Sequence, residues 1–176
     1  MNLKKRKIEK LIPIIKEKIK EISFFEEYQN DEAILKQIID LCELRTFKKG
    51  QTLIKEGDTG DELFIIINGT IDILKNTLQN QTYLVTTLSA ENGGVYVGEL
   101  ALIDEDRRSA TVVAKSQCHC LVLKRDDFVK FGDQHPSIGL HITRSIARQL
   151  SQKLRKTNTD VITLFSALVE EISSES

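Results

Sequence analysis

The chain has 176 residues, of which 40% are hydrophobic, and its formal net charge at neutral pH is −1. This length suits one domain with a single core and helical extensions. The small net charge gives no global field that would favour nucleic acid. Three cysteines argue against a disulfide scaffold and for a reducing, cytoplasmic compartment. No apolar run reaches 18 residues, so we predict neither a membrane span nor a signal peptide.

The N-terminus is predicted to be helical and basic. Residues 1–20 carry eight Lys or Arg and two Glu, a charge of +6 that leaves −7 on the remainder. Apolar residues three or four apart over 3–22 predict an amphipathic helix, kinked or restarted at Pro13. We assign 1–30 to a basic amphipathic extension. Its mixed face favours packing on a partner over binding to a membrane surface.

A second helix is predicted over residues 31–44, with Asp31 as its N-cap. From Phe47 to about Leu123, runs of Ile, Val, Thr and Leu are broken by Gly, Asn and Asp. This pattern predicts several short strands in a barrel or sandwich. Four glycines are interpreted as turn positions that need a positive φ: Gly50, Gly57, Gly60 and Gly69.

Helical spacing returns at Arg125, and Pro136 opens a long helix. Seven positions of that helix follow alternating steps of three and four, which is a heptad seam: Ala147, Leu150, Leu154, Thr157, Val161, Leu164 and Leu168. The seam fits pairing with another helix, in a homodimer for example, and equally fits packing against the protein's own strands.

Residues 97–111 carry the most informative chemistry. Gly98 opens a short turn, Glu99 follows it, and Arg108 and Ser109 come on a second loop. Glycine lets the backbone approach a ligand, free N–H groups attract an anion, and arginine neutralises a phosphate. A carboxylate cannot bind that phosphate, so Glu99 suits a sugar hydroxyl. The alternative is an exposed Glu99–Arg108 ion pair of little energetic value.

The run Gly98-Glu99-Leu100-Ala101-Leu102, followed by Arg108-Ser109-Ala110-Thr111, resembles the phosphate-binding cassette of cyclic nucleotide-binding domains. The Gly-Asp-x-Gly-Asp turn at 57–61 and the Asn-Gly turn at 68–69 also resemble that family. The resemblance covers roughly residues 22–156. It implies an α+β fold, an eight-stranded antiparallel β-roll (jelly-roll-like) flanked by N-terminal helices and a long C-terminal helix. We assign 31–135 to the binding roll and 136–176 to a lid or dimerisation helix.

The resemblance also implies roles for individual residues. Glu99 would accept a hydrogen bond from the ribose 2′-hydroxyl, and Arg108 would pair with the cyclic phosphate. Ser109 and the N–H groups of Leu100, Ala101 and Ala110 would complete the cradle. The base would lie against an apolar wall under the long helix. The resemblance places Ile73, Val85 and Leu88 in that wall and Lys153 in the lid.

Lys153 and Leu154 stand where the bacterial activators place a Thr-Ser pair that bonds adenine, so this part of the lid does not indicate the base. Ser109 goes with cAMP binders in the family, and on that residue we favour cAMP over cGMP. The Cys118-His119-Cys120 triplet cannot easily supply four ligands, and we predict buried cysteines and no metal. No motif indicates an enzyme.

The expected function is a regulatory module that couples cyclic nucleotide binding to the C-terminal helix and an unidentified effector protein. A degenerate fold that serves as a protein-interaction scaffold is the alternative. DNA binding is disfavoured because Glu170, Glu171 and Glu175 stand near the end of the sequence.

Overall fold

The computed structural model describes residues 3–79 and 81–174. The described chain contains, in order, α1 (Leu3–Lys20), η1 (Ser23–Tyr28), α2 (Glu32–Asp40), β1 (Glu43–Phe47), β2 (Thr52–Ile54), β3 (Glu62–Asn68), β4 (Thr70–Asn76), β5 (Thr82–Ser89), η2 (Ala90–Asn92), β6 (Val95–Val97), η3 (Glu99–Leu102), β7 (Thr111–Ala114), β8 (Cys118–Lys124), α3 (Arg125–Gln134) and α4 (Pro136–Ser174).

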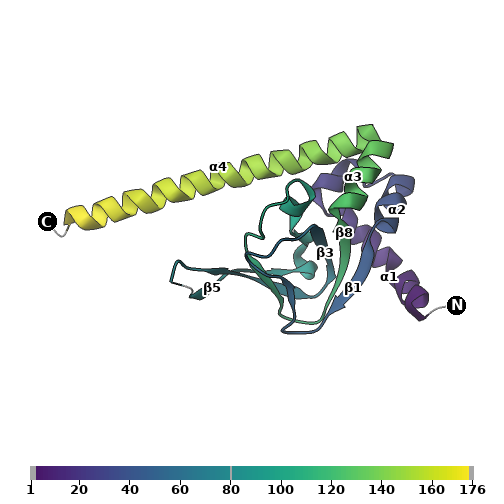
Figure 1. Ribbon diagram of the computed structural model, residues 1–176, viewed down its shortest axis with the longest axis horizontal. Helices are drawn as coiled ribbons and strands as arrows, with labels where there is room; N and C mark the ends of the chain where they lie inside the picture. Colours follow the sequence, from purple (N-terminus) through teal and green to yellow (C-terminus); the bar gives the residue numbers. More distant parts are fainter. Residues whose placement is uncertain (1–2, 80, 175–176) are drawn as a thin grey trace.

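The strands form two four-stranded antiparallel sheets, with the orders β1-β8-β3-β6 and β2-β7-β4-β5. Helices α1, α2 and α3 gather at one side of this roll, and the β4–β5 hairpin projects from the other side (Figure 1). The eight-stranded antiparallel β-roll with flanking helices is therefore confirmed.

Period-two alternation in β3 divides the interior into two cores. Leu63, Ile65 and Ile67 face the helices, where they join a cluster with buried residues of α1, η1, α3 and α4. Phe64 and Ile66 face the other way, into the space between the sheets. This second cluster forms the floor on which the candidate site is built.

Strand β8 obeys the same rule. Cys118 and Cys120 are both buried between the sheets, and His119 is not part of that cluster. Within residues 3–79 and 81–174, no three His, Cys, Asp or Glu side chains are grouped as a metal site would need. The interpretation of these cysteines as core residues is confirmed.

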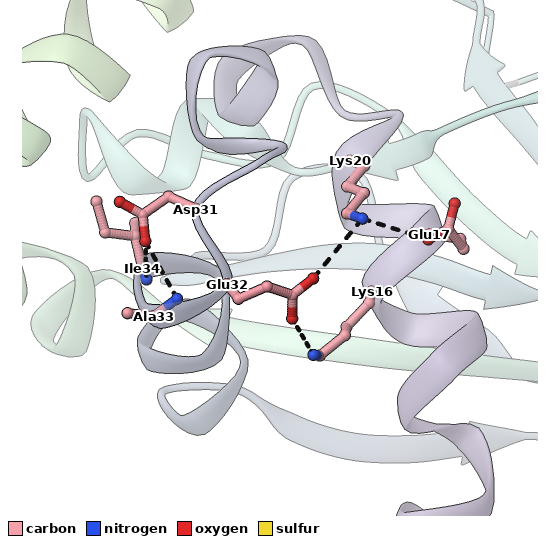
Figure 2. A network of polar contacts seen from close by, with 7 residues as sticks. All are labelled: Lys16, Glu17, Lys20, Asp31, Glu32, Ala33 and Ile34. Carbon is pink, nitrogen blue, oxygen red and sulfur yellow. Dashed lines mark hydrogen bonds and ion pairs between the residues drawn. The ribbon is translucent and has the colours of Figure 1, made fainter.

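The N-terminal helices pack on the roll and on each other. Ile15 and Ile19 of α1 are fully buried in the helix-side core, whereas the side chains of the basic residues 4–10 lie outside the described residues. Lys16 and Lys20 of α1 approach Glu32 of α2 (Figure 2). These ion pairs are partly exposed, so each contributes little to stability.

Asp31 caps α2, because its carboxylate accepts hydrogen bonds from the N–H groups of Ala33 and Ile34 at 3.1 and 3.0 Å (Figure 2). The predicted end of this helix at residue 44 is wrong. The helix ends at Asp40, and Glu43 already pairs with Val122 as the first residue of β1. The sheet thus begins four residues before Phe47, because pairing with β8 overrides the local helical pattern.

Helix α4 begins at Pro136, as predicted, and continues to Ser174. Its first turns are anchored by the buried Gly139, Ile142 and Ile146. Every residue from Ser151 to Ser174 is exposed, and this half of the helix extends away from the helical end of the molecule (Figure 1). None of the helices in the described part of the chain is long and apolar enough to cross a membrane.

The glycine predictions are confirmed at Gly50, Gly57 and Gly69, which have positive φ. The prediction for Gly60 is wrong, because its φ lies outside the left-handed region. Gly60 is required for space instead: a Cβ there would stand 2.5 Å from the Arg108 Nε. The absence of a side chain at residue 60 therefore makes room for the guanidinium.

Candidate functional site

A cavity of about 350 Å³ opens between the roll, η3 and α4. This volume lies within the range of about 300–1,000 Å³ that is usual for small-molecule sites. Ten of the eleven sequence-predicted site residues line it: Gly98, Glu99, Leu100, Ala101, Arg108, Ser109, Ala110, Ile73, Leu88 and Lys153. Residues far apart in sequence thus converge on one site.

The cassette begins with a tight turn at Gly98. Its φ of 83° lies in the left-handed region, and the residue immediately precedes the short 3-10 helix η3. A Cβ at Gly98 would stand 2.7 Å from the Arg108 Nη1 and 2.8 Å from the Glu62 carbonyl oxygen. Glycine is needed here for both backbone conformation and space.

Arg108 reaches across the cavity wall to this turn. Its Nη2 donates to the Glu62 carbonyl oxygen at 2.7 Å, and its Nη1 donates to the Gly98 carbonyl oxygen at 3.4 Å. Two backbone carbonyls therefore hold the guanidinium against the cassette turn. They orient the cation without neutralising its charge.

Among the described residues, no carboxylate forms an ion pair with Arg108, because the nearby Glu62 carboxylate binds Arg45 through two hydrogen bonds of 2.9 and 2.6 Å. Burial lowers the pKa of Arg108, an effect that the charges of Glu62 and Asp61 oppose. Arg108 remains a cation at neutral pH, since its ordinary pKa is so high.

The turn between β2 and β3 fixes the loop that carries Arg108. The Gly57 N–H donates to the Arg108 carbonyl oxygen at 2.9 Å, and the Arg108 N–H donates to the Asp58 carbonyl oxygen at 2.8 Å. Thr59 and Arg107 form an isolated antiparallel bridge beside them. The Gly-Asp-x-Gly-Asp turn thus fixes the backbone of the second cassette loop.

Glu99, the predicted ribose acceptor, forms an ion pair with Lys153 of α4. The Glu99 side chain is only 14% exposed, whereas that of Lys153 is 60% exposed. The carboxylate therefore lies at the cavity wall, and the lysine reaches it from solvent. This contact joins the long helix directly to the cassette.

A second link between α4 and the site was not predicted from the sequence. Tyr96 of β6 lines the cavity, and its hydroxyl donates to the Gln149 side-chain oxygen. The Gln149 Nε2 then donates to the Ser23 Oγ at 2.8 Å. Burial raises the pKa of Tyr96, so the hydroxyl keeps its donating proton at neutral pH. Gln149 and Lys153 are one helical turn apart, so α4 contacts the site through two successive turns.

The apolar wall consists of Ile73, Leu88 and residues that sequence reasoning missed, including Ile54, Val97 and Val112. The prediction that Val85 faces the cavity is wrong, since its side chain is 50% exposed and does not line it. Val85 and Leu88 are three residues apart, a spacing that puts them on opposite faces of a regular strand. A bulge opposite Ile73 and Leu74 also leaves Val85 without a register partner in β4.

The chain is similar to known proteins in sequence and in structure. Human cGMP-dependent protein kinase 2 is 38% identical over 96 residues, which are 53% of this chain and 12% of the kinase. The chain thus spans about an eighth of that relative's length.

Two solved structures share the fold. A cyclic nucleotide-binding domain from Methylobacillus flagellatus KT superposes with a TM-score of 0.71 at 23% identity, covering 87% of this chain and 83% of that one. The cAMP-bound PfPKA-R structure gives a TM-score of 0.61 at 30% identity, covering 69% of this chain and 42% of that one.

The profile of the cyclic nucleotide-binding domain family matches residues 44–135, more than half of the sequence. The matched region contains both cassette loops and the turn that holds Arg108. The chain therefore belongs to the cyclic nucleotide-binding domain family.

Proposed function

We propose that this domain binds a cyclic nucleotide, with cAMP favoured, in the cavity between the roll and α4, and that binding changes the contact between α4 and the cassette. The observation that carries the proposal is the environment of Arg108. It is a half-buried cation in the cavity wall that is held by backbone carbonyls and has no ion pair in the described part of the chain. An anion of small size is the ligand that such a group would bind most strongly.

The remaining groups suit the rest of a cyclic nucleotide. Ser109 and Ala110 lie beside Arg108 on the cavity wall, where they can complete the phosphate cradle. Glu99 can accept a hydrogen bond from a ribose hydroxyl. Ile73 and Leu88 offer an apolar surface to the base. Each part of the ligand therefore has a matching surface within one cavity.

Coupling to α4 follows from the double role of Glu99. A ribose hydroxyl and Lys153 compete for the same carboxylate, so ligand binding weakens the present contact of α4 with the cassette. The helix can then move to close over the base. This is a population shift, and it requires that the nucleotide bind the closed arrangement more tightly than the present one.

The population shift would act on other molecules through the changed position of α4. Its exposed half from Ser151 to Ser174 offers a surface for an effector protein or for a second copy of the domain. The regulatory role is thus to convert nucleotide occupancy into a change in a helix–helix contact.

Calorimetric titration with cAMP, cGMP and 5′-AMP tests the ligand assignment. We expect saturable binding of cAMP and at least ten-fold weaker binding of 5′-AMP, whose extra charge and open phosphate do not suit a single arginine. Absence of heat and of any thermal shift with all three nucleotides would overturn the proposal. It would favour the interaction scaffold without nucleotide.

The second candidate ligand is cGMP. The specific observation in its favour is the 38% identity to the cGMP-dependent protein kinase. Ser109 at the cassette favours cAMP, and its hydroxyl is the group to vary. If cGMP binds more tightly than cAMP, the function stands and the assignment of the base changes.

A further inference from the structure

The loop between η3 and β7 carries three consecutive acidic residues that divide between two surfaces. Asp104 and Asp106 line the nucleotide cavity, whereas Glu105 lines a separate hollow beside α3. Glu105 forms an ion pair of 3.0 Å with Arg125, and the Arg125 Nη1 donates to the Asp104 carbonyl oxygen at 2.9 Å. Helix α3 thus holds this loop so that two carboxylates border the cavity. We call Asp104 and Asp106 the cavity carboxylates.

The cavity carboxylates have no ion pair within residues 3–79 and 81–174. The Asp106 Oδ1 accepts a hydrogen bond of 2.7 Å from the backbone N–H of Arg107, which orients the carboxylate without cancelling its charge. Both residues are exposed. They therefore act on a ligand through their field rather than by direct contact with a cation.

The charges around the cavity add up to zero. Among the described residues, three acidic and three basic side chains line it: Glu99, Asp104, Asp106, Arg107, Arg108 and Lys153. Lys153 pairs with Glu99, which leaves two arginines and the cavity carboxylates on the cassette loops. A phosphate with one negative charge can pair with Arg108. A second negative charge on the same phosphate meets a wall whose remaining cation, Arg107, adjoins Asp106.

This balance determines which phosphate the site accepts. We propose that the cavity carboxylates are a charge filter, which admits the monoanionic phosphate of a cyclic nucleotide and repels the dianionic phosphate of a 5′-nucleotide. The filter rests on the proposed function and adds to it the residues that select the phosphate. Hydrolysis of cAMP to 5′-AMP keeps the base, frees the ribose 3′-hydroxyl and adds one negative charge. That added charge is what the cavity carboxylates distinguish.

The size of the effect follows from Coulomb's law, because the repulsion is proportional to the charge of the ligand. Removing both cavity carboxylates should strengthen binding by about two- to four-fold for each unit of ligand charge, as two charges on the order of 10 Å away in water produce at low salt. The phosphate of cAMP carries one charge. A phosphate monoester carries two at pH 8, because its second pKa is about 6. The gain for 5′-AMP is therefore the square of the gain for cAMP.

Competition calorimetry at pH 8 and low salt tests the filter on the full chain. Asp104→Asn combined with Asp106→Asn removes both charges and keeps the side-chain shapes, so that residue 106 can still accept the Arg107 N–H. We expect the preference for cAMP over 5′-AMP to fall by about two- to four-fold, with both nucleotides bound more tightly. An unchanged preference in this double variant would overturn the filter.

The matched control is Glu105→Gln, which removes one charge from the same loop on the side away from the cavity. Its ion pair with Arg125 is a surface contact, since the Glu105 side chain is 83% exposed, and the fold should persist. Each of the single variants Asp104→Asn and Asp106→Asn removes the same charge as this control and should lower the preference more. If Glu105→Gln lowers the preference as much as they do, the filter is refuted, because the loss would reflect net charge alone.

Salt separates a field from a rearranged loop. In 1 M salt, where the Debye length is about 3 Å, the difference between the double variant and the unsubstituted chain should vanish. A difference that persists in 1 M salt would contradict the filter and indicate altered loop structure instead.

Failure of the filter and failure of the proposed function give different results. If the unsubstituted chain binds cAMP and the double variant keeps the same preference, only the filter is refuted. If neither protein binds cAMP, cGMP or 5′-AMP, the proposed function is refuted and the filter with it.

Discussion

At the scale of single residues, the described part of the site contains a cation without an ion pair, Arg108, and a carboxylate with one, Glu99. The guanidinium of Arg108 donates to two backbone carbonyl oxygens and forms no ion pair within the described residues, so its charge is available to a ligand. Glu99 is bound by Lys153 through its Oε1, and we propose that a ribose hydroxyl competes for this oxygen. The phosphate can therefore bind at once, whereas the ribose must exchange with the helix.

Replacing Lys153 tests this competition. In Lys153→Met the carboxylate of Glu99 is free, and we expect cAMP to bind about 1.4- to five-fold more tightly, the range that a partly exposed ion pair of about 0.2–1 kcal/mol allows. Arg155→Met, two residues further along the same exposed helix, should leave the dissociation constant unchanged. Calorimetry measures both variants. Weaker binding in Lys153→Met would mean that the lysine contacts the nucleotide and does not compete with it.

At the scale of structural elements, the turn between β2 and β3 controls the position of Arg108. Gly60→Ala would place a Cβ 2.5 Å from the Arg108 Nε. The arginine side chain is flexible, so its guanidinium can move aside. We expect the fold to persist and cAMP binding to weaken about ten-fold, through loss of charge-assisted contacts.

The matched control for Gly60→Ala is Gly132→Ala in α3, where a new Cβ would meet the Gly139 Cα at an ordinary 3.6 Å. Thermal melting without ligand and titration with cAMP should be recorded for both. A Gly60→Ala protein that melts early, or one that binds normally, would show that the turn does not act by positioning Arg108.

Helix α4 is the second element whose behaviour can be predicted. If it closes over the base, its amides around Gln149 and Lys153 should exchange more slowly once cAMP is bound. Hydrogen exchange followed by mass spectrometry measures this for peptides covering residues 146–156, with peptides from α2 as an internal reference. Unchanged exchange in a saturated complex would rule out the coupling that we propose.

At the scale of the whole molecule, strand periodicity and glycine turns are local signals that predicted short strands in a barrel or sandwich. The eight-stranded roll itself was implied by the resemblance to cyclic nucleotide-binding domains. The cavity could be largely predicted because Gly98, Glu99 and Arg108 stand at a recognisable spacing. What could not be predicted depends on tertiary contacts. The bulge that leaves Val85 without a register partner is set by pairing with β4, and the Tyr96–Gln149–Ser23 chain joins residues of three distant segments.

Ligand binding should also stabilise the whole domain. At a cAMP concentration of about one hundred times the dissociation constant, linkage gives about 2.7 kcal/mol. For a chain of this size the Tm should then rise by about 5–10 °C. Differential scanning calorimetry measures the rise, with 5′-AMP at equal concentration as control. Equal rises with both nucleotides would indicate nonspecific anion binding.

The central claim is that Arg108 binds the phosphate of a cyclic nucleotide, and its most direct test is calorimetric titration of Arg108→Ala with cAMP. Removing one member of a desolvated charge pair costs about 2–5 kcal/mol, so affinity should fall by about 30-fold to several-thousand-fold. Arg107→Ala is the matched control and should bind nearly normally, because the exposed guanidinium of Arg107 donates to the Gly57 carbonyl oxygen. Normal binding by a folded Arg108→Ala protein would contradict the account.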